Sequence, residues 1–86
     1  MPDPRRKRLL YTSQHRGMRE MDLVLGGFAR AHVPSMTEED LTCFEELLAF
    51  SDRELYGLIF EGKACLEEHL RGMVKAIRMQ CSSVAV

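Results

Sequence analysis

The sequence predicts an all-α protein, a compact bundle of about five short helices in a single domain. Apolar residues recur at spacings of three and four in several segments, which is the period of one helix face. Helix start signals precede these segments, and no useful length of chain alternates apolar and polar residues as a β-strand would. A chain of 86 residues has room for one domain, residues 1–86, and we expect flexible ends at 1–4 and 82–86.

A first helix is predicted from Arg5 to about Gln14. Asp3 is a typical N-cap and Pro4 a typical first helical residue, because proline lacks the N–H that would be unpaired there. The apolar residues that this helix contributes are Leu9, Leu10 and Tyr11. Gly17 is the expected break after it, since glycine readily adopts the left-handed conformation that closes helices.

A second helix is predicted to end near His32, because Pro34 disfavours helical backbone in the residue before it. Its apolar face consists of Met18, Met21, Leu25, Phe28 and Ala29. Gly26 and Gly27 lie inside this helix, where each costs about 1 kcal/mol relative to alanine. A close helix crossing would explain the pair.

Two capping boxes predict where the third and fourth helices begin, one at Thr37 to Asp40 and one at Ser51 to Glu54. Gly62 is expected to stop the fourth helix, and a last helix should run from about Ala64 to Gln80. The residues expected to face the core are Leu41, Phe44, Leu47 and Leu48 on the third helix, Leu55, Leu58 and Ile59 on the fourth, and Leu66, Leu70, Met73, Val74 and Ile77 on the last.

The composition is that of an ordinary globular protein, with 45% hydrophobic and 29% charged residues and a net charge of −1. The charge is unevenly placed. The first fifth of the chain is basic through Arg5, Arg6, Lys7, Arg8, Arg16 and Arg19, and the middle is acidic through Glu38, Glu39, Asp40, Glu45 and Glu46. The run from Arg5 to Arg8 is either a solvated basic arm or a docking arm for an acidic surface.

Sites for catalysis are absent from the sequence. Cys43, Cys65 and Cys81 are odd in number and lack CxxC spacing, which fits free thiols in a reducing compartment, and Cys43 is expected in the core or at its boundary. The three histidines do not form a zinc pattern with them, and no phosphate-binding glycine motif occurs. Ser13 and His15 are too close in sequence to face each other. We therefore expect neither an enzyme nor a metal protein.

Nucleic-acid binding and membrane insertion are also disfavoured. A generic helical interaction module, or a DNA-associated module using the basic N-terminal helix, is the alternative function, but the acidic third helix would be repelled by phosphates. No apolar run approaches the roughly 20 residues that span a membrane, and no secretory signal is evident. We expect a cytoplasmic protein if the source is bacterial, and a mitochondrial-matrix protein if it is eukaryotic and already processed.

The segment from Arg16 to Glu20 is the strongest candidate for a functional site. Arg16 and Glu20 are four residues apart, with Gly17 between them. On a helix this spacing places both charges on one side, where they can pair or face a partner together. The simpler interpretation is a helix junction with an exposed ion pair worth about 0.3 kcal/mol.

The residues around this segment resemble a known family. The run from Arg8 to Tyr11, followed by His15 to Leu23, is similar to the small succinate dehydrogenase assembly factors, whose hallmark is Arg-Gly-x-x-Glu. Further matches are Phe28-Ala29 with His32, the segment from Met36 to Leu41, and the segment from Asp52 to Tyr56. The resemblance covers roughly residues 5 to 60. Leu58 departs from the family pattern, because many relatives have an aromatic residue at this position. The departure bears on whether the fourth helix packs, or contacts a partner, as it does in those relatives.

The resemblance implies an assembly factor that binds the flavoprotein subunit of succinate dehydrogenase or fumarate reductase and promotes covalent FAD attachment. FAD would belong to the client, so no cofactor of its own is expected, and the sequence carries no signal about self-association. The partner-binding residues implied are Arg16, Gly17, Met18, Glu20, Asp22 and Tyr11. Gly17 would admit the partner backbone, and the charged pair would supply directional hydrogen bonds. Arg19 occupies a variable position of the motif, so it is a weaker candidate for partner binding than these residues.

Overall fold

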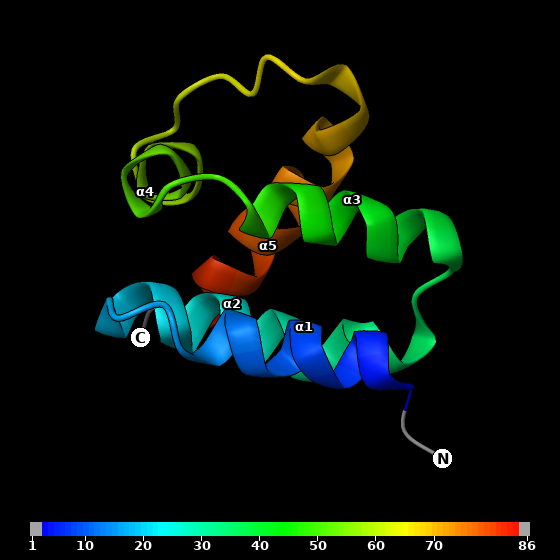
Figure 1. The fold of residues 1–86 in the computed structure, drawn as a ribbon. Coiled ribbons are helices and arrows are strands. Elements are labelled where there is room, and N and C mark those ends of the chain that lie inside the picture. Colours follow the sequence, from blue (N-terminus) through cyan, green and yellow to red (C-terminus); the bar gives the residue numbers. More distant parts are fainter. Residues whose placement is uncertain (1–2, 85–86) are drawn as a thin grey trace.

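The structure is a computed structural model that describes residues 3–84, and within that range it contains helices and no strands (Figure 1). The elements are α1 (Pro4–Gln14), α2 (Arg19–His32), η1 (Val33–Ser35), α3 (Glu38–Leu48), α4 (Asp52–Phe60), η2 (Glu68–Leu70) and α5 (Arg71–Val84), where η marks a 3-10 helix. The predicted all-α class is confirmed.

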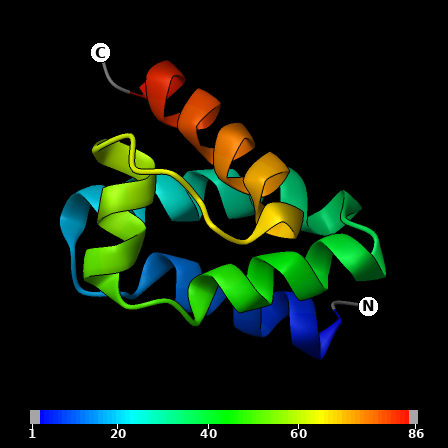
Figure 2. The same ribbon diagram turned by 90° about the horizontal axis from the view of Figure 1, so that it is seen from above.

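The helices are arranged so that the turn between α1 and α2 lies at one end of the molecule. α1 and α2 run antiparallel and side by side, and α3 lies across from α1 (Figures 1 and 2). α5 packs against both α2 and α4. Both views place α4 over the end of the molecule that carries the α1–α2 turn, and the N-terminus lies at the opposite end.

A continuous apolar core joins all five α-helices. Its fully buried residues include Met21, Leu25, Leu41, Phe44, Leu47, Leu55, Leu70 and Ile77. The rings of Phe28 and Phe44 lie with their centroids 5.7 Å apart and connect α2 to α3. Each such side chain contributes roughly 1.5–3 kcal/mol by leaving water. All the residues predicted to face inward from α3 and α4 are buried.

The predicted helix starts are confirmed by their caps. The Asp3 carboxylate accepts a hydrogen bond from the Arg5 backbone N–H at 2.9 Å, with Pro4 in the first turn. Thr37 and Ser51 each form a complete capping box with the acid three residues later. Asp3 and Pro4 form the start of α1, and residues 1 and 2 lie outside the described range, so the flexibility expected for residues 1–4 stays a prediction.

The last helix begins later than the sequence predicts. It starts at Arg71 instead of Ala64, and an irregular loop and η2 precede it. The Arg71 Nε donates to the Cys65 carbonyl at 2.9 Å, and Arg78 donates to the carbonyls of Leu58 and Lys63 at 2.6 and 2.7 Å. Two of these carbonyls, those of Lys63 and Cys65, are ones that a helix starting at Ala64 would use for its own hydrogen bonds.

One further prediction near this end is wrong. Leu66 was expected in the core but is 84% exposed, because it lies in the loop and not on a helix face. α5 extends to Val84, beyond the expected end near Gln80, and residues 85 and 86 lie outside the described residues, so the flexibility expected for 82–86 stays a prediction.

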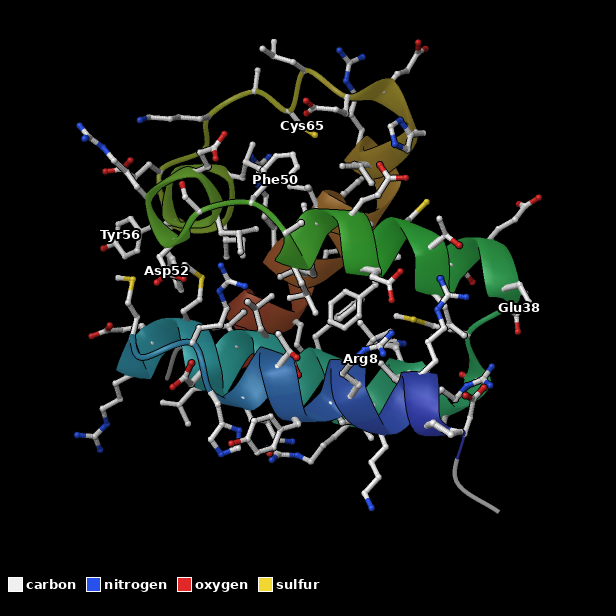
Figure 3. All side chains as sticks on the ribbon, viewed as in Figure 1. Arg8, Glu38, Phe50, Asp52, Tyr56 and Cys65 are labelled. Carbon is white, nitrogen blue, oxygen red and sulfur yellow. The ribbon has the colours of Figure 1, made fainter. Side chains whose placement is uncertain are left out.

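The basic N-terminal segment is neither a free arm nor disordered. Arg5 pairs with Glu38 on α3 at 2.9 Å, and Arg8 pairs with Glu45 on α3 at 3.3 Å. Arg6 donates to the carbonyls of Val33 and Met36. Figure 3 shows Arg8 on the side of α1 that faces α3. The basic start of the chain is therefore largely neutralised by its acidic middle, which leaves fewer free cations there for a nucleic acid.

The paired glycines of α2 have different environments, and they generate a stability prediction. A Cβ on Gly26 would lie 2.8 Å from Cγ of Gln14 in α1, whereas a Cβ on Gly27 would meet only Nε2 of Gln80 at 3.8 Å.

We expect Gly27→Ala to stabilise the protein by about 0.5–1 kcal/mol through helix propensity. Gly26→Ala should destabilise it by roughly 1–2 kcal/mol through overpacking. Urea unfolding of the two variants tests this, and equal stability of both would contradict a close α1–α2 crossing at Gly26.

Candidate docking site at the turn between α1 and α2

The turn between α1 and α2 depends on a glycine and on one side chain from the helix that follows. Gly17 has a φ of +96°, which disfavours any residue with a Cβ. The Arg16 backbone N–H donates to Oδ1 of Asp22 at 2.8 Å, so α2 holds the turn that precedes it. The predicted break at Gly17 is confirmed, and the backbone here has a defined shape.

The Arg16 side chain connects this turn to the junction between α3 and α4. Its Nη1 and Nη2 donate to the carbonyls of Leu48 and Phe50 at 2.7 Å each, and its Nε donates to Oδ1 of Asp52 at 2.8 Å. The side chain is 11% exposed. The carbonyls lie at the negative end of α3, where a cation is favoured. Figure 3 shows Asp52 on the part of α4 that faces the turn.

Of the two interpretations that the sequence left open, an ion pair between Arg16 and Glu20 does not form in the structure. Arg16 precedes α2 instead of lying on it, so the four-residue helix spacing does not apply, and its guanidinium pairs with Asp52. Glu20 is exposed, and no group within residues 3–84 forms a hydrogen bond or ion pair with its side chain. The motif therefore contains one inward-facing cation and one free carboxylate.

The surface beside Gly17 is open. A Cβ built on Gly17 meets no atom within 4 Å, so the residue is required by its φ and not by internal packing. A hollow of about 480 Å³ adjoins it, which we call the Gly17 hollow. Its lining residues are Gln14, Gly17, Arg19, Asp22, Leu23 and Arg30.

A second hollow, the Met18 hollow, lies between the same turn and α4. It has a volume of about 460 Å³ and is lined by Met18, Arg53, Tyr56, Glu61 and Lys63. Met18 is half-buried and packs against the core. Tyr56, visible at the edge of α4 in Figure 3, is also half-buried and packs on Phe60 with 4.9 Å between ring centroids.

An exposed aromatic pair lies just before the turn. Tyr11 was expected among the apolar residues of the first helix, yet it is 65% exposed. Its ring stacks on His15 with 4.0 Å between centroids, and the His15 Nδ1 lies 2.8 Å from the Tyr11 carbonyl oxygen. Exposed tyrosines offer a large contact area at low entropic cost, which suits a binding surface.

The six residues predicted for partner binding fall into groups that the structure separates. Tyr11, Gly17 and Glu20 are exposed, whereas Met18 and Asp22 are half-buried and the Arg16 side chain is mostly buried. Sequence reasoning missed the residues that complete this end of the molecule, namely Leu23, Arg30, Asp52, Arg53 and Tyr56. Leu23 had a visible signal as an apolar residue off the apolar face of its helix, and Asp52, Arg53 and Tyr56 lie in a segment that matches the family.

The Cys43 thiol is not activated as a nucleophile. Burial raises the pKa of the Cys43 thiol, and the nearby carboxylates of Glu46 and Asp40 raise it further, so the poorly nucleophilic thiol form persists at neutral pH. Among the side chains that the structure describes, no three of His, Cys, Asp or Glu gather in a way that could hold a metal ion.

None of the helices in the described part of the chain has the length and apolar character that a bilayer span requires.

The structure is that of a small all-α protein with an open, braced turn between its first two helices. The family is shown by sequence comparison: the chain belongs to the Sdh5 family, described as flavinator of succinate dehydrogenase, which matches residues 7–81. This confirms the resemblance inferred from the Arg-Gly-x-x-Glu segment and its neighbours.

Several curated relatives are similar to this chain. A protein of Acetobacter pasteurianus named FAD assembly factor SdhE is 40% identical over 81 residues, covering 88% of this chain and 73% of the relative. A Dictyostelium discoideum protein named succinate dehydrogenase assembly factor 2, mitochondrial, is 35% identical over 78 residues, covering 91% of this chain and 55% of the relative. A Candida glabrata protein of the same name is 46% identical over 54 residues, or 63% of this chain.

The chain spans only about half of the Dictyostelium relative and about a third of the Candida relative. The search of solved structures gave no significant match.

The contacts of Arg16 generate a prediction that separates its role from that of its neighbours. Arg16→Ala should lower the free energy of unfolding by roughly 2–3 kcal/mol, because two carbonyls and a carboxylate lose their donor. Arg19→Ala makes the same chemical change at an exposed arginine without an internal acceptor, and should stay within about 0.5 kcal/mol of the wild type. Urea unfolding measures both. Equal stability of the two variants would show that the Arg16 contacts do not support the fold.

Proposed function

We propose that this protein binds the flavoprotein subunit of succinate dehydrogenase, or of fumarate reductase, and promotes covalent attachment of FAD to that subunit. The observation that carries the proposal is the braced, open turn at Gly17, with the free carboxylate of Glu20 one helical turn away. Family membership and the names of the relatives support it, since these refer to FAD assembly and to succinate dehydrogenase.

Some residues of this segment hold the turn in its shape, and others contact the partner. Arg16 and Asp22 fix the turn from inside, so that little ordering remains to be done on binding. Gly17 allows the partner backbone to approach closely. Glu20 accepts charge-assisted hydrogen bonds from the partner, and Tyr11 supplies an apolar anchor beside them.

In this proposal the protein is an assembly factor and not an enzyme. The bond to the flavin forms within the client, between its own side chain and FAD, and FAD remains the client's cofactor. This chain acts by binding preferentially to a client conformation that is competent for the attachment, which raises the population of that conformation. The proposed site of action is the bacterial cytoplasm or the mitochondrial matrix, and the relatives include a bacterial FAD assembly factor and mitochondrial succinate dehydrogenase assembly factors.

Replacing Glu20 tests the proposed contact. Glu20→Ala should weaken binding to the purified flavoprotein subunit about tenfold or more, because a charged hydrogen bond to the partner is lost. Covalent flavin in the subunit, read by in-gel flavin fluorescence, should fall in parallel, while the unfolding midpoint stays unchanged. Glu39→Ala is the control, since it removes an exposed carboxylate from α3, far from the turn. Wild-type binding and flavin yield with Glu20→Ala would exclude this role for Glu20.

Replacing Gly17 tests whether the open backbone matters beyond its conformation. Gly17 and Gly62 both have positive φ, at +96° and +68°, and a Cβ at either one meets no atom within 4 Å. Ala at either position should cost roughly 1–2 kcal/mol of stability through backbone strain. Only Gly17→Ala should also impair binding to the flavoprotein subunit, measured by biolayer interferometry at a temperature where both variants are folded. If both variants bind equally well, close approach at Gly17 is not part of the interface.

A further inference from the structure

The arginines of this chain fall into two sets according to whether they have an acceptor within the molecule. Those that donate to carboxylates or carbonyls of the chain are Arg5, Arg6, Arg8, Arg16, Arg71 and Arg78. Arg19, Arg30 and Arg53 have no acceptor among residues 3–84. All three line the Gly17 hollow or the Met18 hollow. Each unpaired guanidinium group therefore belongs to a residue that lines one of the two hollows beside the turn.

On the α2 side, two of these arginines lie on one line of the helix. Arg19 and Arg30 are eleven residues apart, close to three full turns, so they point the same way about 16 Å apart along the axis. Leu23 lies one turn after Arg19 on the same face and is 56% exposed. This face of α2 presents two cations with an apolar side chain between them.

On the α4 side, Arg53 shares the Met18 hollow with Tyr56, which Figure 3 places at the edge facing the turn. Gly17 and Met18 are consecutive, so the two hollows flank the same piece of backbone. Together they form a surface that begins at Arg30, passes the turn and ends at Arg53.

Most carboxylates on or beside this surface already have a hydrogen-bond or ion-pair partner within the chain. Asp22 accepts the Arg16 N–H, and Glu61 pairs with Lys63 at 3.5 Å. Glu20 is the free carboxylate. Three free guanidinium groups thus face solvent beside one free carboxylate, although the whole chain has a net charge of −1.

We propose that Arg19, Arg30 and Arg53, with Leu23 between the first two, form a docking surface for an acidic patch of Asp and Glu side chains on the client flavoprotein. The proposal rests on the proposed function and specifies the chemistry of the partner surface. Guanidinium groups bind carboxylates through paired, directional hydrogen bonds. Complementary charge also speeds encounter between the proteins, and added salt weakens this effect.

A protein partner suits this surface better than a nucleic acid. The three arginines are separated, and an exposed leucine lies among them, which fits discrete carboxylates around an apolar contact. A phosphate backbone favours a continuous basic track. The cations that could have extended such a track, Arg5 and Arg8, are paired with α3.

The experiment compares two double variants with the same change in net charge. Arg19→Gln/Arg30→Gln removes two charges from the surface, and Lys7→Gln/Lys75→Gln removes two from exposed lysines that line neither hollow. Association with immobilised flavoprotein subunit is followed by biolayer interferometry at low and at high ionic strength. We expect the arginine variant to associate about tenfold more slowly at low ionic strength and to lose most of its salt dependence, and the lysine variant to stay within about twofold of wild type. Arg53→Gln should show a smaller effect of the same kind.

The outcomes separate this proposal from the proposed function. If wild type binds the subunit and the arginine variant binds it identically at both ionic strengths, the docking surface is overturned while the proposed function stands. Equal slowing in the lysine variant would show an effect of net charge alone and would also overturn it. Wild type failing to bind the subunit would defeat the proposed function and this surface with it.

Two further readouts complete the test. The thermal unfolding midpoint of the arginine variant should equal that of wild type, and a large decrease would contradict the premise that these guanidinium groups are free. Salt-sensitive retention of wild type on duplex DNA, lost in the arginine variant while its association with the flavoprotein is unchanged, would assign the surface to nucleic acid instead.

Discussion

The hydrogen bonds of the Arg16 guanidinium are the interaction on which this end of the molecule depends. One side chain satisfies two carbonyls at the end of α3 and the carboxylate of Asp52 at the start of α4. An isolated charge so little exposed would be costly, but here each donor has an acceptor in good geometry. The contact fixes α4 against the α1–α2 turn, and so it places Arg53 and Tyr56 of α4 beside Met18 in the Met18 hollow.

A single short motif therefore carries two kinds of residue. Arg16 builds the turn from inside, with Asp22 holding its backbone, whereas Gly17 and Glu20 are presented to solvent. A surface whose shape is fixed before binding loses less entropy when a partner arrives. A protein of this size is expected to have modest stability. In this chain, polar contacts from Arg16 and Asp22 to neighbouring segments hold the surface in its shape.

The arginines of the chain can likewise be divided into those that make contacts within the molecule and those that are exposed to solvent. The basic N-terminal turns of α1 are matched to acids of α3, which stabilises their packing and removes those arginines from the surface. The arginines left without acceptors line the two hollows beside the turn. A chain that is nearly neutral overall can thus present a locally basic surface, because the arginines at the start of α1 are paired with acids and those that line the hollows are not.

The sequence by itself determined the helix class, the three cap-defined starts, the break at Gly17 and, through the residues around it, the family. These features depend on residues within a few positions of each other, where local hydrogen bonds and steric limits act. Tertiary structure alone decided that Arg16 pairs with Asp52, 36 residues away, and that Tyr11 and Leu66 face solvent. It also decided that α5 begins at Arg71, because arginines from α5 hold carbonyls of the preceding chain. Such choices rest on contacts between distant segments, and periodicity and local propensity carry no information about them.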